Sequence, residues 1–329
     1  MKGPPAGIDE RELSRVLRDH WGLAPVQLGY LPVGFGAHHW ELIDPVGRRW
    51  FVTVSGLTRG WGTVPAAEFA DLRDSMDTVV GLAEAGLEFA VPPVPAAGGQ
   101  ALVPLGGEHA VTVFPYIAGA AGDGADKLPE GERIVLIDML ARLHGVGRRA
   151  APTAPVRRPD LAARPVLEAA LAELGRPWDG GPYSEPARDL LARHASRVRR
   201  ALVIFDQLAR EAARSGPAVI THGEPHPGNI LRCAGRLYLI DWDTVGLALP
   251  ERDLWDVADA DSPEAGRYTD RTGRRLSAAV MRMYRIRWSL DEIMLSLREF
   301  RGPHELNEDS EMAWDALAEE IRNILQLEL

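Results

Sequence analysis

The pattern that most constrains this chain lies in residues 222–243. There Glu224 is followed five positions later by Asn229, and Asp241 then ends an apolar run, residues 237–240. One carboxylate can orient or deprotonate an attacking hydroxyl, whereas an amide oxygen and a second carboxylate are suitable ligands for Mg²⁺ beside phosphates. This spacing is therefore what phosphoryl transfer from a nucleotide requires.

The residue sequence of the motif resembles that of one known superfamily. His-Gly-Glu-Pro-His-Pro-Gly-Asn-Ile-Leu, followed by Leu-Ile-Asp-Trp-Asp, is similar to the aminoglycoside phosphotransferase and choline-kinase-like superfamily. The resemblance implies a bilobal, protein-kinase-like α+β fold, with a small antiparallel-sheet N-lobe and a larger, mainly helical C-lobe. It also implies ATP- or GTP-dependent, Mg²⁺-assisted phosphorylation of a hydroxyl on a small molecule. The superfamily usually carries Asp where this chain has Glu224.

Composition narrows the class of protein. The net charge of −10 argues against nucleic-acid binding, which generally needs a basic face, and suits either a cationic substrate or plain solubility. No apolar run of membrane-spanning length and no signal peptide is visible, and the single cysteine, Cys233, excludes an intramolecular disulfide framework. We therefore expect a cytoplasmic protein that acts on a small molecule, without a membrane or nucleic-acid partner.

Residue periodicity predicts the order of the elements. Asp9 is expected to cap a helix over 10–21, with Glu12 completing a capping box. Strands are expected at 27–31, 37–43, 49–54, 101–104 and 109–114, with a helix over 66–86. Further helices are expected at 132–147, 165–175, 185–214, 264–284, 286–300 and 309–327. The domains predicted from this order are an N-lobe (1–114), a hinge (115–119) and a C-lobe (120–329).

The catalytic roles follow from the motif. Glu224 is expected to align the substrate hydroxyl, and Asn229 and Asp241 to bind Mg²⁺. His222 is expected to hold the loop by hydrogen bonding rather than to bind a metal, because no cysteine or further histidine cluster supports zinc. By the resemblance, Asp253 braces the catalytic loop from behind.

Nucleotide binding is assigned to the N-lobe. Gly34 and Gly36 flank a turn between two expected strands, where backbone N–H groups could cover phosphates. Kinases place a lysine in the third strand, but Thr53 stands at that position here. Arg73, paired with Glu68, is one possible substitute for its charge.

The resemblance also assigns the adenine site. The hinge backbone, at Phe114, Tyr116 and Ile117, is expected to hydrogen-bond the adenine.

Two groups of residues are candidates for binding the acceptor. Trp178, Asp179 and Tyr183 lie in a glycine-rich loop and could stack on, and pair with, a sugar or a cation. By the resemblance, acidic residues of a C-terminal helix, here Asp291 and Glu292, also contact the substrate.

Three functional readings stay open at this point. The first is a kinase for an aminoglycoside, another hydroxylated antibiotic or a sugar, with a choline-like alcohol or a nucleoside as further possible acceptors. The second is a pseudokinase that binds a ligand or partner, motivated by the joint departures at Glu224 and Thr53. The third is a nucleotidyl or other transferase that uses the same pocket. The oligomeric state is not predicted.

Overall fold

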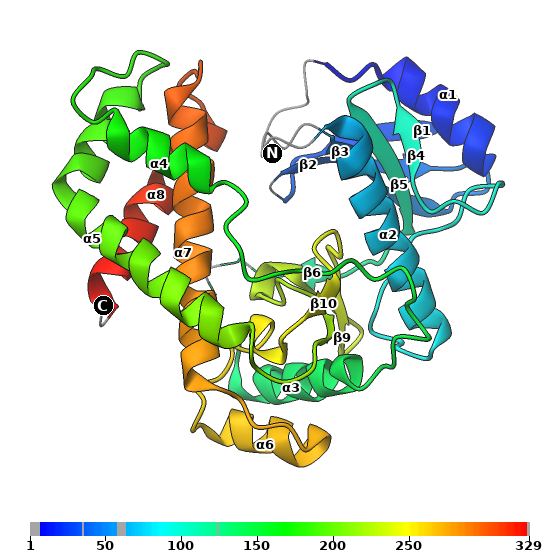
Figure 1. Ribbon diagram of the computed structural model, residues 1–329. Coiled ribbons are helices and arrows are strands. Elements are labelled where there is room, and N and C mark those ends of the chain that lie inside the picture. Colours follow the sequence, from blue (N-terminus) through cyan, green and yellow to red (C-terminus); the bar gives the residue numbers. More distant parts are fainter. Residues whose placement is uncertain (1–6, 35, 58–63, 123, 125, 328–329) are drawn as a thin grey trace. The chain divides into compact units, whose positions relative to one another are not determined.

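The computed structural model describes residues 7–34, 36–57, 64–122, 124 and 126–327 (Figure 1). These residues form two compact units. The first contains the described residues up to Arg157 together with Pro217–Arg275, and the second contains Arg158–Gly216 and the described residues from Leu276 onward. The chain thus leaves the first unit and later returns to it.

The first unit begins with a helix on an antiparallel sheet. Helix α1 (Glu10–Trp21) starts where the Asp9 carboxylate accepts a hydrogen bond from Arg11 N, and it ends at Gly22, whose φ is +67°. The five-stranded sheet has the order β1-β2-β3-β5-β4. Its strands are β1 (Gln27–Leu31), β2 (Ala37–Ile43), β3 (Arg49–Gly56), β4 (Val103–Leu105) and β5 (His109–Pro115).

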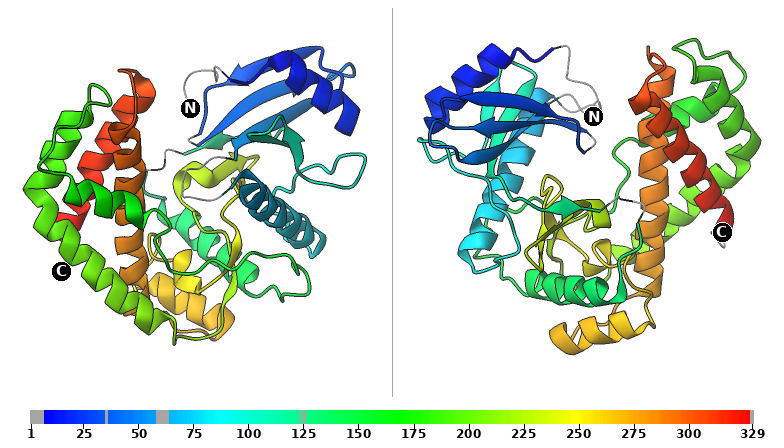
Figure 2. Two further views of the ribbon diagram at one scale, coloured as in Figure 1. Left: turned by 45° about the horizontal axis from the view of Figure 1, so that its top comes forward. Right: turned by 180° about the vertical axis from the view of Figure 1, so that it is seen from behind.

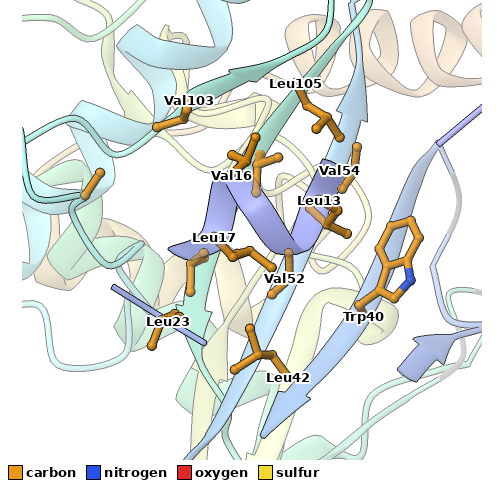
Figure 3. Packing of buried hydrophobic residues seen from close by; sticks show 13 residues of the cluster. Leu13, Val16, Leu17, Leu23, Trp40, Leu42, Val52, Val54, Val103 and Leu105 are labelled. Atoms are coloured by element: carbon orange, nitrogen blue, oxygen red, sulfur yellow. The ribbon is translucent and has the colours of Figure 1, made fainter. Parts of the chain in front are cut away.

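One face of this sheet packs against α1. Leu13 and Leu17 of the helix lie among alternate strand residues, including Trp40, Val52 and Val54, and all five are almost completely buried (Figure 3). Because side chains alternate across a strand, the intervening residues lie on the opposite face. On that second face, Thr53 of β3 pairs with His39 of β2 on one side and with Thr112 of β5 on the other.

The rest of the first unit combines helices with two small sheets. Helix α2 (Pro65–Glu84) follows β3, and α3 (Glu130–His144) and α6 (Pro263–Thr272) lie later in the chain. One sheet has the order β6-β8-β9 and the other pairs β10 with β7. The strands are β6 (Ala120–Ala121), β7 (Val219–Thr221), β8 (Ile230–Cys233), β9 (Arg236–Leu239) and β10 (Gly246–Ala248), with short 3₁₀ turns η1 (Pro227–Asn229) and η2 (Pro250–Arg252).

The regular elements in the described residues of the second unit are helices. It contains α4 (Arg164–Ala172), α5 (Ser184–Ala212), α7 (Ala278–Arg301) and α8 (Glu308–Gln326). Helices α5, α7 and α8, drawn in green, orange and red, lie alongside one another in both views of Figure 2. Leu290, Ile293 and Leu297 of α7 are fully buried and supply much of the core between them.

The α+β fold class predicted from the sequence is confirmed, but one helix boundary was predicted wrongly. Continuous helices were expected over 264–284 and 286–300, whereas α6 ends at Thr272 and α7 runs unbroken from Ala278. Gly273 adopts φ +71° and terminates α6, and the Ser277 hydroxyl caps α7 by accepting from Val280 N. These local signals outweigh the continuous apolar pattern.

Candidate active site

The catalytic-loop candidate, residues 222–229, connects β7 to β8 in the first unit. Asn229 Nδ2 donates to the carbonyl oxygen of Glu224 at 3.0 Å, so the two ends of the motif are held to each other. The Ile240 N–H donates to the carbonyl oxygen of Asn229 at 3.1 Å. The loop is therefore tied directly to the residue that precedes Asp241.

The side chain of His222 also connects the loop to Ile240. Its Nε2 lies 2.9 Å from the carbonyl oxygen of Ile240, and its Nδ1 accepts the Glu224 N–H at 3.3 Å. A carbonyl can only accept, so Nε2 carries the proton and Nδ1 is the acceptor of a neutral ring. Full burial lowers the pKa of His222 to about 4, in keeping with that assignment. One imidazole thus links the backbones that carry Glu224 and Asp241.

Gly223 is required by the space around it. Its φ is +110°, and a Cβ at this position would lie 2.4 Å from both Arg252 Nη2 and Thr244 Oγ1. Arg252 itself donates to Thr221 Oγ1 and to the carbonyl oxygen of Thr244. The buried arginine therefore packs where any side chain at residue 223 would have to go.

Asp253 lies behind the loop and accepts from two of its backbone N–H groups. His222 N and Gly223 N each donate to this carboxylate at 2.7 Å, and His144 Nε2 lies 3.0 Å from it. Tyr268 OH lies 2.8 Å from His144 Nδ1 and extends the network. Burial alone would raise the pKa of Asp253, but the hydrogen bond from His144 and the nearby Arg252 lower it. The carboxylate is held ionised where it fixes the loop backbone.

Asn229 and Asp241 present the donor set expected for a hard cation. The described residues give Asn229 Oδ1 no hydrogen-bond partner, whereas its Nδ2 is engaged within the loop. Asp241 is exposed and adopts φ +63°, a left-handed conformation that is uncommon outside glycine. An amide oxygen and a carboxylate are ligands that Mg²⁺ accepts, so these residues fit that ion.

Helix α2 is anchored to the segment after Asp241 by residues that sequence reasoning missed. Arg157 donates to both oxygens of Asp71 at 2.9 and 2.7 Å, to Ser75 Oγ at 2.8 Å, and to the carbonyl oxygens of Asp243 and Val245. Ser75 Oγ also donates to Asp243 O at 3.1 Å. The segment around Arg157 reads as a Pro/Arg-rich linker in sequence, and no local signal points to this contact.

The glycine turn and the third strand are joined by a histidine. Gly34 and Gly36 have φ of +71° and +86°. His39 Nδ1 lies 3.2 Å from Thr53 Oγ1, and its Nε2 would lie 3.1 Å from a Cβ placed on Gly34. Arg73, the substitute suggested by the sequence, donates to its neighbour Asp74 instead and is half-exposed.

The hinge candidate leads from β5 to β6. Tyr116 N donates to the carbonyl oxygen of Arg49 at 3.3 Å, and the Arg49 guanidinium lies 3.7 Å from the centre of the Tyr116 ring. Phe114, the residue before the end of β5, is half-buried, and the carbonyl oxygen of Ile117 accepts from Gly119 N at 2.9 Å. No described contact assigns these residues to adenine.

The five substrate candidates all lie in the second unit. Tyr183 stacks on Trp314 with ring centres 5.4 Å apart and its N–H donates to His304 Nε2, while Trp178 is buried with Arg301 over its ring. Asp179 is exposed. Asp291 lies 3.2 Å from Arg287 Nε one turn earlier on α7, and Glu292 next to it is half-buried.

The structure therefore joins Glu224, Asn229, His222 and Asp253 in one hydrogen-bonded network, which reaches the backbone of Ile240, the residue before Asp241. In the helical unit, Tyr183 stacks on Trp314, and Trp178 has the Arg301 guanidinium over its ring. The supporting residues that the sequence did not reveal are His144, Tyr268, Arg252, Arg157 and His39.

Comparisons with known proteins agree with this fold. Protein StrN of Streptomyces griseus is 29% identical over 254 residues, which is 72% of each chain. The structure of spectinomycin phosphotransferase APH(9)-Ia, in complex with ADP and spectinomycin, superposes with a TM-score of 0.74 at 15% identity and covers 97% of this chain and 98% of that one. Choline kinase LicA of Streptococcus pneumoniae gives a TM-score of 0.61 at 14% identity, over 97% of this chain and 99% of its own.

The family match covers most of the chain, from the first strand of the sheet to α7. The profile of the "Phosphotransferase enzyme family" matches residues 30–292, a span that includes the glycine turn, the hinge candidate and the whole catalytic loop. These residues also hold the hydrogen-bonded network described above. The protein therefore belongs to the phosphotransferase enzyme family and is a small-molecule phosphotransferase.

Proposed function

We propose that the protein transfers the γ-phosphoryl group of ATP or GTP directly to a hydroxyl of a hydroxylated antibiotic, such as an aminoglycoside, or of a sugar. Glu224 orients that hydroxyl, and Asn229 and Asp241 hold Mg²⁺. One observation carries the proposal: His222 and Asn229 tie the backbone of Glu224 to the residue that precedes Asp241. The carboxylate that orients the acceptor hydroxyl and the groups that hold the metal must keep a fixed separation, and this network supports one by fixing their backbones.

Glu224 acts on the acceptor. Its side chain is half-buried, and its N–H is fixed by His222 Nδ1. A carboxylate held in this way accepts the proton of the hydroxyl as the new bond to phosphorus forms. Asp253 keeps the loop in place through the N–H groups of His222 and Gly223 and takes no part in proton transfer.

The cofactor assignment rests on the donor set. Asn229 Oδ1 and the Asp241 carboxylate supply two oxygen ligands, and a magnesium site of this kind is completed by phosphate and water oxygens. Mg²⁺, when bound there, neutralises charge on the phosphates.

The choice of acceptor class is supported by the relatives and by the charge of the chain. Structures of similar proteins have been determined in complex with spectinomycin, with amicoumacin and with hygromycin B. Several hydroxylated antibiotics carry amines, and the net charge of −10 favours the approach of a cation. In the helical unit, the acceptor-binding residues that we propose are Trp178, Asp179, Tyr183, Asp291 and Glu292.

The test is a transfer assay read by mass spectrometry. The protein is incubated with Mg²⁺ and either ATP or GTP against spectinomycin, other aminoglycosides, further hydroxylated antibiotics and small sugars. We expect one acceptor to gain the mass of a single phosphoryl group. A nucleotidyl product, or no product together with no nucleotide binding, would contradict the proposal.

The variant Asp241→Ala tests the metal role. It should abolish Mg²⁺-dependent turnover, and Glu224→Gln should lower kcat by about 10²–10⁴-fold. Asp160, an exposed carboxylate outside the site, is the matched control, and Asp160→Ala should retain full activity. Full activity of Asp241→Ala would rule out its role as a metal ligand.

A further inference from the structure

The position of the missing lysine is occupied by a pair of side chains. Thr53 lies at the centre of a cross-strand row, between His39 of β2 and Thr112 of β5. This row is on the face of the sheet opposite the α1 core. Thr53, between Val52 and Val54, stands where the kinase sequence pattern places the lysine that binds the α- and β-phosphates.

His39 is held so that one ring nitrogen is directed to the glycine turn. Its Nδ1 contacts Thr53 Oγ1 at 3.2 Å, and its ring packs on Phe51 with centres 4.9 Å apart. Nε2 lies beneath Gly34, where a Cβ would come within 3.1 Å of it. Within the part of the chain that the structure describes, Nε2 has no hydrogen-bond partner.

The nearby arginines of the sheet and of α2 form ion pairs with other residues. Arg48 pairs with Asp44, Arg49 with Glu41 and the Tyr116 ring, and Arg73 with Asp74. Arg59 lies outside the described residues. Among described residues of this face, His39 is thus the ionisable donor placed against Thr53.

We propose that His39 and Thr53 together bind the nucleotide phosphates in place of the lysine, with His39 Nε2 donating to a phosphate oxygen beneath the glycine turn and the Thr53 hydroxyl fixing the ring through Nδ1. The proposal rests on the proposed function, because it assigns residues to the same nucleotide site. An imidazole can donate in either protonation state, and a bound polyanion favours its charged form. Glycine suits position 34 because its φ is +71° and because a Cβ there would lie 3.1 Å from His39 Nε2, so the ring would have to shift.

The test separates phosphate recognition from adenine recognition. Dissociation constants for ATP, ADP and adenosine, each with Mg²⁺, are measured by calorimetry for the wild type, His39→Asn and His39→Gln. An asparagine amide can replace Nδ1 toward Thr53 but does not reach the position of Nε2, whereas a glutamine amide reaches the position of Nε2. We expect His39→Asn to weaken ATP and ADP binding about tenfold to a hundredfold and to leave adenosine binding unchanged. His39→Gln should retain more of the ATP affinity.

Two further variants complete the experiment. Thr53→Lys should restore ATP affinity in the His39→Asn background, since it places an ammonium at the kinase position, and Arg59→Ala should leave ATP affinity unchanged. Unchanged ATP affinity in His39→Asn, equal losses for ATP and adenosine, or a loss confined to Arg59→Ala would each overturn the assignment of His39. If the wild type bound none of the three ligands and also failed to bind GTP, the proposed function itself would fail, and the phosphate assignment with it.

Discussion

Glu224 reaches one methylene further than the aspartate usual in this superfamily, so the position of its carboxylate depends on where the backbone starts. That start is fixed by the hydrogen bond from Glu224 N to His222 and by the ring of Pro225, which restricts the preceding backbone. We therefore propose that the loop is shaped around the longer side chain.

The variant Glu224→Asp tests whether the loop is adapted to the longer side chain of glutamate. Withdrawing the carboxylate by about an ångström should lower kcat by on the order of a hundredfold, because the acceptor hydroxyl is no longer aligned. The KM for the nucleotide should stay the same. Steady-state kinetics measure both quantities, and a faster Glu224→Asp enzyme would show that the loop is not adapted to glutamate.

Gly223→Ala tests the crowding beside the loop. The new methyl would lie 2.4 Å from Arg252 and from Thr244, in addition to the strain of a left-handed backbone. Gly99 provides a matched control, because its φ is +85° but nothing lies within 4 Å of a Cβ placed there. Urea unfolding should show a loss of about 1 kcal/mol for Gly99→Ala from backbone strain, and a clearly larger loss for Gly223→Ala. Equal losses would contradict the crowding argument.

At the scale of elements, helices and strands with local sequence signals could be predicted, whereas contacts between residues distant in sequence could not. Asp9 and the apolar stripe of α1 lie within one stretch of sequence, and α1 was predicted to the residue. The break at Gly273 depends on a single left-handed residue within an otherwise helical pattern, and it was missed.

Much of the site's support depends on residues far apart in sequence. His144 and Asp253 are 109 positions apart, and Arg157 and Asp71 are 86 apart. Such pairs come together only in the folded protein, so the spacing of residues in the sequence could not predict these contacts. The loop motif was visible because its chemistry is contained within 20 residues or so of continuous chain.

Arg157 makes an element-scale prediction, because it joins α2 to the segment after Asp241. Arg157→Lys keeps a charge for Asp71 but loses the planar fork that also reaches Ser75 and the Asp243 carbonyl. We expect the Mg²⁺ concentration needed for half-maximal turnover to rise roughly tenfold, which corresponds to the loss of about one charge-assisted hydrogen bond. The exposed neighbour Arg158 is the control, and equal Mg²⁺ dependence of Arg157→Lys and Arg158→Lys would disprove the coupling.

At the scale of the whole molecule, buried histidines make stability depend on pH. The pKa of His222 is about 4 in the folded protein, below the ordinary value of 6.5. Between these values the unfolded chain binds a proton that the folded chain does not, so stability falls as pH decreases from 6.5 to 4. His39, whose pKa is also lowered to about 4 by burial, acts in the same direction.

Urea unfolding at pH 7 and at pH 4.5 measures this effect. His222 alone should contribute a loss of up to about 3 kcal/mol over the full window. Asp253 adds a further loss at lower pH, because its depressed pKa means that its contribution disappears only as pH falls through that value. His39→Gln should make the decline between pH 7 and 4.5 shallower, and a stability that does not change over this range would contradict the prediction.

The chain passes through the first unit twice, since residues 158–216 and the helices after residue 275 belong to the second. During synthesis from the N-terminus, the five-stranded sheet and α2 leave the ribosome before β7 to β10 exist. Arg157 emerges before its carbonyl partners at residues 243 and 245 have been made. The first unit of the nascent protein is therefore incomplete while α4 and α5 are synthesised, and the catalytic-loop segment completes it only after them.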